Sequence, residues 1–238
     1  MILKLAVLTA SILQVVGAAY LNIGAFNDPT QTLPVFIQPA GWAFSIWGLI
    51  YALSFVYAVY QIIPQNDNQL LQSTRVPALV GFLASIAWLY FASMDNWLLW
   101  LTAPVLFLMA FAFVRVVNAP DTEDKKQTLL SKQILYPYAA WTGIACWLNA
   151  QTLLNDMSIV TSSTANLITN GVLFICIAIF TLGYFKKTQY NAWYGGVLVW
   201  AGIGVVSANL NGGSLLFAVL GGLLSVVAFG LYMRKRLK

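Results

Sequence analysis

Long apolar stretches separated by short polar connections run along the whole 238-residue chain. A helix needs about 20 apolar residues to cross the hydrocarbon core of a bilayer. Because lipid cannot hydrogen-bond to exposed backbone, spans of this kind are expected to be helices, and the period-two alternation of a membrane barrel is absent. We therefore predict an all-α, polytopic transmembrane bundle of about eight spans, at residues 3–25, 41–63, 76–94, 97–117, 131–154, 165–185, 190–209 and 213–233.

Composition supports the same class. Hydrophobic residues make up 60% of the chain and charged residues 8%, whereas about a quarter of the residues of a soluble domain are charged. The lipid bilayer is therefore the expected surroundings of most of the chain.

The basic residues lie on one side of the membrane if the chain crosses it eight times with the N-terminus inside. All twelve Lys and Arg residues then fall on the inner side, and the outer loops hold none. Cytoplasmic loops carry such an excess, so both termini are predicted to be cytoplasmic. The net charge of +5 then reflects topology, and no nucleic acid partner is expected. Without a transit signature, the plasma (inner) membrane is the expected location.

The first stretch has an alternative interpretation. Lys4, an apolar run and then Gly17, Ala18 and Ala19 resemble a secretory signal with a small-residue cleavage site. The apolar run continues to Phe26, which is long enough to cross the bilayer, so a retained span is preferred.

The absence of some side chains excludes several enzyme classes. The chain has no histidine, so His-ligated haem, H-E-x-x-H zinc and serine–histidine chemistry lack a ligand or a base. The seven carboxylates lie in predicted loops or at span ends, which argues against a proton-coupled carrier. We expect no catalytic residue, no metal site and no resident cofactor.

Two of the expected helices carry a stripe of rings and polar groups. At about 100° per residue, each stripe occupies one face and could form a wall of a cleft for a flat apolar molecule with a polar edge. Alternatively, the rings pack between helices and Asn149 bonds a carbonyl group. The stripes consist of Tyr138, Trp141, Thr142, Ala145 and Asn149 in the fifth span and of Trp47, Tyr51, Ser54 and Ala58 in the second.

Apart from Ser54 and Ala58, these residues belong to two motifs, P-x-x-W-x-F-x-x-W-G-x-x-Y from Pro39 and L-Y-P-Y-x-A-W-x(6)-L-N from Leu135. Together the motifs resemble the tryptophan-rich sensory protein or translocator protein (TspO/MBR) family, over about residues 1–155. The resemblance implies a five-helix protein that binds porphyrins, sterols and synthetic aromatic ligands in a cleft between helices, under a lid formed by residues 26–38. The ligand-binding residues it implies are Trp47, Tyr51, Trp88, Tyr138, Trp141, Ala145 and Asn149.

The chain also departs from the family pattern. Members commonly have two adjacent prolines before the second span and an Asn-Trp-x-Trp-Pro-Pro stretch in the third. This chain has Gln38-Pro39 and Ser85 to Tyr90, where only Trp88 matches. Three further spans follow, so we predict a five-helix unit at residues 1–158 and a three-helix extension at 159–238, an extended form of the family.

The extension is rich in glycine. Gly204 and Ala208, like Ala218 and Gly222, have the small-xxx-small spacing that allows helices to approach closely. Packing within one subunit is the preferred interpretation, and a homodimer interface is the alternative.

Three functions follow from these patterns and from the resemblance. The preferred one is binding, and with it transport or sensing, of an apolar planar ligand such as a tetrapyrrole or a sterol. The first alternative is a secondary carrier of a small metabolite, which would require internal repeat symmetry. The second, implied by the resemblance alone, is a membrane enzyme that degrades porphyrin through Trp47.

Overall fold

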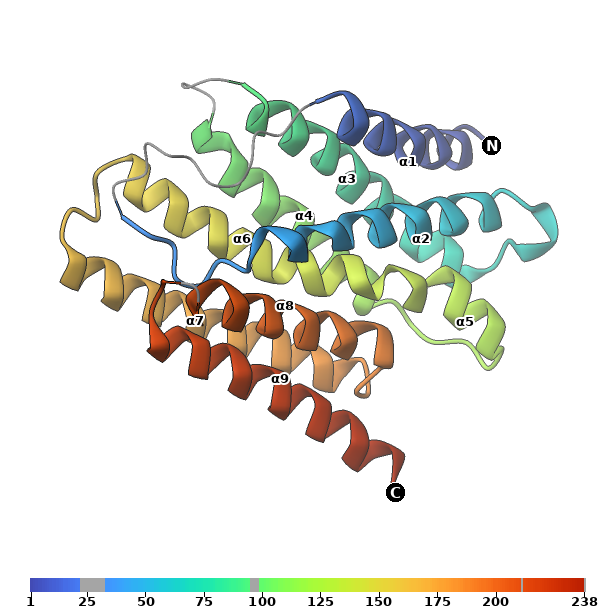
Figure 1. Cartoon of the computed structure of the whole chain (residues 1–238). Helices are drawn as coiled ribbons and strands as arrows, with labels where there is room; N and C mark the ends of the chain where they lie inside the picture. The colour runs from blue at the N-terminus through green and yellow to red at the C-terminus, as the bar shows by residue number, and fades with distance from the viewer. Residues whose placement is uncertain (22–32, 95–98, 211, 238) are drawn as a thin grey trace. The chain divides into compact units, whose positions relative to one another are not determined.

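The computed structural model describes the chain except for residues 22–32, 95–98, 211 and 238 (Figure 1). The described part is helical, with no strand in it, and this confirms the predicted all-α class. The α-helices are α1 (Ile2–Tyr20), α2 (Ile46–Tyr60), α3 (Gln69–Ala92), α4 (Thr102–Val117), α5 (Lys125–Ser131), α6 (Tyr136–Asp156), α7 (Ser163–Lys187), α8 (Ala192–Leu210) and α9 (Leu215–Arg236). Short 3-10 turns are η1 (Gly41–Ser45), η2 (Pro64–Asn66), η3 (Leu99–Leu101) and η4 (Gln133–Leu135).

Six helices in the described residues are long and apolar enough to cross a membrane. They are α1, η1 with α2, α3, α7, α8 and α9. The two other expected spans are also helical: α4 is apolar but has 16 residues, and α6 has 21 residues and carries several amide side chains. A polytopic helical membrane protein is thereby confirmed.

The third helix begins earlier than the apolar pattern predicts. The expected span starts at residue 76, whereas α3 starts at Gln69. Asn68 caps it, because its Oδ1 accepts a hydrogen bond of 2.8 Å from the Leu71 N–H. Hydropathy detects the part of a helix that lies in lipid and misses a polar first turn that lies outside it.

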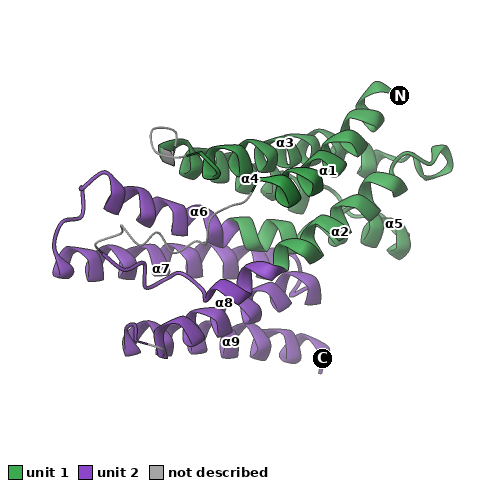
Figure 2. Ribbon diagram, turned by 45° about the horizontal axis from the view of Figure 1, so that its top comes forward, with its two compact units in different colours: residues 1–23, 46–142 green, residues 24–45, 143–238 purple. Residues whose placement is uncertain are grey.

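The contacts divide the chain into two compact units (Figure 2). Unit 1 comprises Met1–Ile23 and Ile46–Thr142, and unit 2 comprises Gly24–Ser45 and Gly143–Lys238. The boundary therefore passes through α6. These units are defined by contacts alone, and the functional division at residue 158 stays a prediction.

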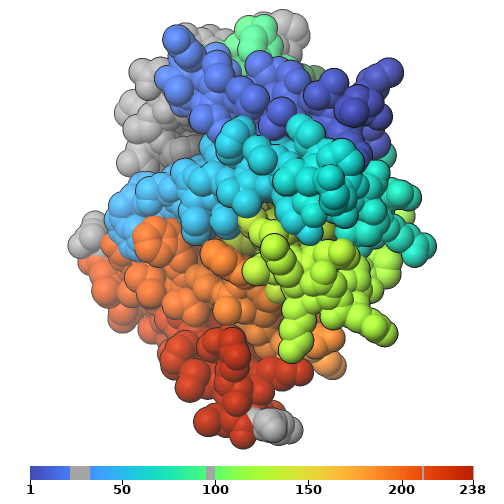
Figure 3. Space-filling model, turned by 90° about the vertical axis from the view of Figure 1, so that its right-hand side faces the viewer, coloured from blue at the N-terminus to red at the C-terminus, as the bar shows by residue number. Residues whose placement is uncertain are grey.

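In unit 1, α3 packs against both α1 and α4. Gly81 of α3 allows the close approach of α4, because a Cβ atom there would lie 2.5 Å from the Phe113 ring. The N-terminus, the α2–α3 connection and α5 lie at the same end of this unit (Figure 1). Figure 3 faces that end, with the cyan α2–α3 region between the dark blue start of α1 and the yellow-green α5 region.

A polar network ties this end of unit 1 together. The Asp67 carboxylate accepts from Arg75 Nη2 at 2.8 Å and lies 3.0 Å from Lys4 Nζ. Gln61 accepts from Arg75 Nε at 3.0 Å and donates to the Lys4 carbonyl oxygen at 2.8 Å. The hydrogen bonds from Arg75 and then Lys4 lower the pKa of the Asp67 carboxyl to about 2. Two basic residues that are 71 positions apart in sequence thus share one anion.

In unit 2, α8 and α9 lie side by side through facing glycines (Figures 1 and 2). A Cβ atom on Gly202 would lie 2.5 Å from the Gly221 carbonyl oxygen, and one on Gly221 would lie 2.8 Å from the Gly202 carbonyl oxygen. Gly204 packs against Pro39 within the same unit. These glycines serve packing inside one chain, as preferred from the sequence, and a homodimer stays a prediction.

A non-helical segment before η1 is held by amide side chains in unit 2. Each of four asparagines pairs with a different backbone group of residues 33–37, at 2.8 to 3.2 Å. Asn155, Asn166 and Asn209 donate to the carbonyl oxygens of Leu33, Pro34 and Phe36, and Asn170 accepts from the Ile37 N–H. The segment thus obtains from side chains the hydrogen bonds that a helix would supply from its own backbone.

We expect Gly202→Ala to destabilise the protein by about 1–3 kcal/mol, because the added methyl group meets backbone across the α8–α9 contact. Thermal unfolding in detergent measures the effect. Gly196→Ala is the matched control in the same helix, since nothing lies within 4 Å of its Cβ position. An equal response of both variants would contradict the packing role of Gly202.

We expect the stability difference between the parent protein and Asp67→Asn to depend on pH. The folded-state pKa of Asp67, about 2, lies below the usual value near 3.9 for an unfolded chain. The contribution of the carboxylate is therefore fully present above about pH 4 and is lost as pH falls towards 2. Denaturation of both proteins across this range measures it, and a difference that grows on acidification would refute the ion-pair role.

Candidate functional site

Five aromatic side chains from three helices of unit 1 meet around one indole. We call Trp47, Tyr51, Trp88, Tyr138 and Trp141 the aromatic cluster. The Trp47 ring stacks on Trp88 with centroids 5.7 Å apart, and its centroid lies 5.3 Å from that of Tyr51. It meets Tyr138 edge-on at 5.6 Å and Trp141 edge-on at 6.5 Å. All five side chains are buried, with exposed fractions between 0% and 9%.

Helical spacing brings these residues together. Trp47 and Tyr51 are one turn apart in α2, and Ser54 and Ala58 continue the same buried face. The stripe predicted for the second span is therefore confirmed as a buried face. In α6, Tyr138 and Trp141 lie on neighbouring turns, and both are at most 1% exposed.

The cluster continues into two rings that the sequence analysis missed. Phe113 of α4 stacks on Tyr138 with ring centroids 4.0 Å apart, and Phe82 of α3 stacks on it at 5.9 Å. Gly81 is the sequence signal for this arrangement, since only a residue without a side chain leaves room for the Phe113 ring. Phe82 and Phe113 also contact each other, with centroids 6.1 Å apart, so Tyr138 is packed against a pair of apolar rings.

The polar atoms of the cluster bond to neutral partners. The Tyr138 hydroxyl donates to Gln14 Oε1 at 2.9 Å, which joins α6 to α1. The Tyr51 hydroxyl shares a hydrogen bond of 3.3 Å with Ser85 Oγ of α3. Gln14 was not identified from the sequence, although a glutamine inside an otherwise apolar N-terminal helix was the available signal.

Two buried donors at the cluster have no acceptor within the described residues. They are the Gln14 Nε2 amide group and the Trp47 Nε1 indole group. The Gln14 side chain is fully buried, and Trp47 is 9% exposed. A buried donor without a hydrogen bond costs about 1–3 kcal/mol. These groups can therefore bind a polar acceptor that enters the site.

Ala145 and Asn149 lie further along α6, in unit 2. Asn149 Nδ2 donates to the Ala145 carbonyl oxygen at 3.2 Å, within the same helix. This is the bond that the packing interpretation of the stripe predicts, and the role of both residues in ligand binding stays a prediction. Of the expected lid at 26–38, residues 26–32 lie outside the described part of the chain.

The chemistry of the site is that of neutral rings, hydroxyls and amides. No group of three or more Cys, Asp or Glu residues in the described parts of the chain is placed to hold a metal ion. The arrangement can stack on a planar molecule and hydrogen-bond its polar edge.

Comparison with known proteins places the chain in a family. Searches among curated proteins and among solved structures found no match. The model of the family described as TSPO-like protein matches residues 2–233. The match extends beyond the region of motif resemblance and includes the three C-terminal helices. The chain therefore belongs to the TSPO-like protein family.

Proposed function

We propose that this protein binds an apolar planar ligand, such as a porphyrin or a sterol, within the membrane. The observation that carries the proposal is the aromatic cluster, in which α2, α3 and α6 bring five rings to one place. Aromatic pairs contribute about 0.5–1.5 kcal/mol beyond the burial of their area. Ligand rings would replace some of these ring contacts. Membership of a TSPO-like family favours ligand binding or sensing over catalysis.

The two unpaired donors define the polar part of this ligand. Both donors lie next to Tyr138: Gln14 accepts a hydrogen bond from its hydroxyl, and Trp47 contacts its ring edge-on. A carboxylate, carbonyl or hydroxyl oxygen on the ligand would satisfy the Gln14 and Trp47 N–H groups. The ligand would thus combine a flat apolar body with an acceptor at its edge, a description that fits a tetrapyrrole carboxylate or a sterol hydroxyl.

The same proposal includes the orientation of the chain. In unit 1 the basic residues Lys4 and Arg75 meet at one end, and in unit 2 basic residues occupy the last turns of α7 and α9. By the positive-inside rule these ends are cytoplasmic. The plasma (inner) membrane is the proposed location.

We expect Trp141→Ala to weaken protoporphyrin IX binding at least about tenfold, since it removes a fully buried ring of the cluster. The measurement is a titration of purified protein in detergent, followed by the absorbance of the porphyrin. Trp193→Ala is the matched control, because that indole is 40% exposed in α8. Monodisperse elution of each variant shows that it is folded.

Several outcomes would decide against this function. Equal affinity of Trp141→Ala and the parent would exclude the aromatic cluster as the site. Light-dependent loss of porphyrin absorbance that requires Trp47 would favour the degrading enzyme. No binding, together with saturable uptake of a polar solute into proteoliposomes, would favour a carrier.

We expect Gln14→Leu to reduce the affinity for the porphyrin free acid about tenfold and to change the affinity for its dimethyl ester little. The reason is that the carboxylate is the stronger acceptor for the Gln14 amide. Tyr138→Phe is the companion variant, since it removes the hydroxyl that positions Gln14 and keeps the ring. If Gln14→Leu weakened acid and ester equally, the amide would not contact the carboxylate.

A further inference from the structure

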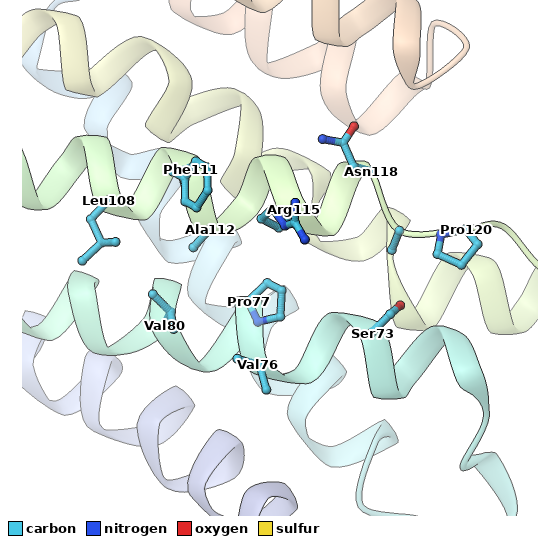
Figure 4. Close-up of a pocket in the computed structure, with 11 residues that line it drawn as sticks. Ser73, Val76, Pro77, Val80, Leu108, Phe111, Ala112, Arg115, Asn118 and Pro120 are labelled. Carbon is cyan, nitrogen blue, oxygen red and sulfur yellow. The ribbon is translucent and has the colours of Figure 1, made fainter.

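A groove lies between α3 and α4 on unit 1, apart from the aromatic cluster (Figure 4). Its volume is about 550 Å³, within the range of about 300–1,000 Å³ that holds small molecules. No residue of the aromatic cluster lines it. The apolar part of its lining comes from Val76, Pro77 and Val80 of α3 and from Leu108, Phe111 and Ala112 of α4.

The apolar part of the groove faces outward. Val76, Leu108 and Phe111 are 53%, 49% and 62% exposed. On a membrane helix, exposed apolar side chains of this size contact lipid tails rather than water. The groove is therefore open to the hydrocarbon phase.

One end of the groove is polar and basic. Arg115, in the last turn of α4, lines it together with Ser73 and Asn118. Figure 4 shows Arg115 on the side of α4 that faces Pro77 of α3. No ion pair or hydrogen bond joins Arg115 to another described residue, in contrast to Arg75 and Lys132. No carboxylate lines the groove.

We propose that this groove binds one anionic glycerophospholipid. Its phosphate lies on the Arg115 guanidinium, and one acyl chain lies along Val76, Val80 and Leu108. Arg matches phosphate geometry with two parallel hydrogen bonds, and Asn118 adds an amide donor. Arg115 lies at the basic end of unit 1, where the cytoplasmic leaflet supplies anionic headgroups. A bilayer also supplies this ligand at high local concentration.

Native mass spectrometry of the purified chain tests the proposal, with phosphatidylglycerol and phosphatidylcholine of identical acyl chains added in detergent. We expect one phosphatidylglycerol to be retained at least tenfold more strongly than phosphatidylcholine. Arg115→Gln should abolish that preference, and Arg115→Lys should retain part of it. Arg234→Gln is the matched control, an exposed arginine in the last turn of α9, and should leave the preference unchanged.

A second variant tests the acyl part of the site. Val80→Phe adds a ring to the apolar part of the groove, leaves the Arg115 side chain in place and should weaken retention of both lipids. The proposal is overturned if Arg115→Gln retains phosphatidylglycerol like the parent, if both lipids bind the parent equally, or if a second copy of the chain occupies the groove instead. Porphyrin affinity should be unchanged in Arg115→Gln, which separates this site from the aromatic cluster.

Discussion

Backbone that is not helical inside a membrane protein needs hydrogen-bond partners from the protein, because lipid offers none. In unit 2 this requirement falls on residues 33–37, and amide side chains meet it. The requirement also explains why α6 is more polar than the other expected spans. Its last turns carry Gln151 and Asn155, and Gln151 Nε2 donates to Asn166 of α7 at 3.1 Å. The polarity of α6 therefore has a structural cause in the segment it holds.

Hydrogen-bond pairing also distinguishes Gln14, at the aromatic cluster, from the asparagines that hold residues 33–37. The asparagines around residues 33–37 bond directly to backbone, so their amides are committed to holding the segment in place. Gln14 bonds the Tyr138 hydroxyl and keeps a buried N–H group without an acceptor among the described residues. A cluster that only filled space would need neither polar group, because leucine here together with phenylalanine at position 138 would leave neither the amide nor the hydroxyl to be paired. The glutamine instead orients a tyrosine and leaves a donor for a third group.

Helical periodicity predicted the faces of α2 and α6, and the motif resemblance added Trp88. The five aromatic residues among them meet in the aromatic cluster, because each lies on the buried side of its helix. The place of Ala145 and Asn149 in the site stays a prediction. Phe82, Phe113 and Gln14 could not be found in this way. Their helices are apolar on most sides, so the partner of each side chain is set by tertiary packing at Gly81 and by the Tyr138 hydroxyl. The early start of α3 at Gln69 depends on a cap that hydropathy does not detect.

The distribution of basic residues predicts which loops face the cytoplasm. It does not indicate which of these charges are free to interact with lipid. Lys4 and Arg75 share Asp67, and Lys132 pairs with Asp121 at 2.7 Å, so much of their charge is neutralised within unit 1. Arg115 has the same sequence environment, a basic residue at the end of an apolar helix, but lines a groove without a carboxylate. Two arginines that are equivalent for topology thus differ in chemistry. Arg75 holds helices together, and Arg115 presents its charge to the surrounding membrane.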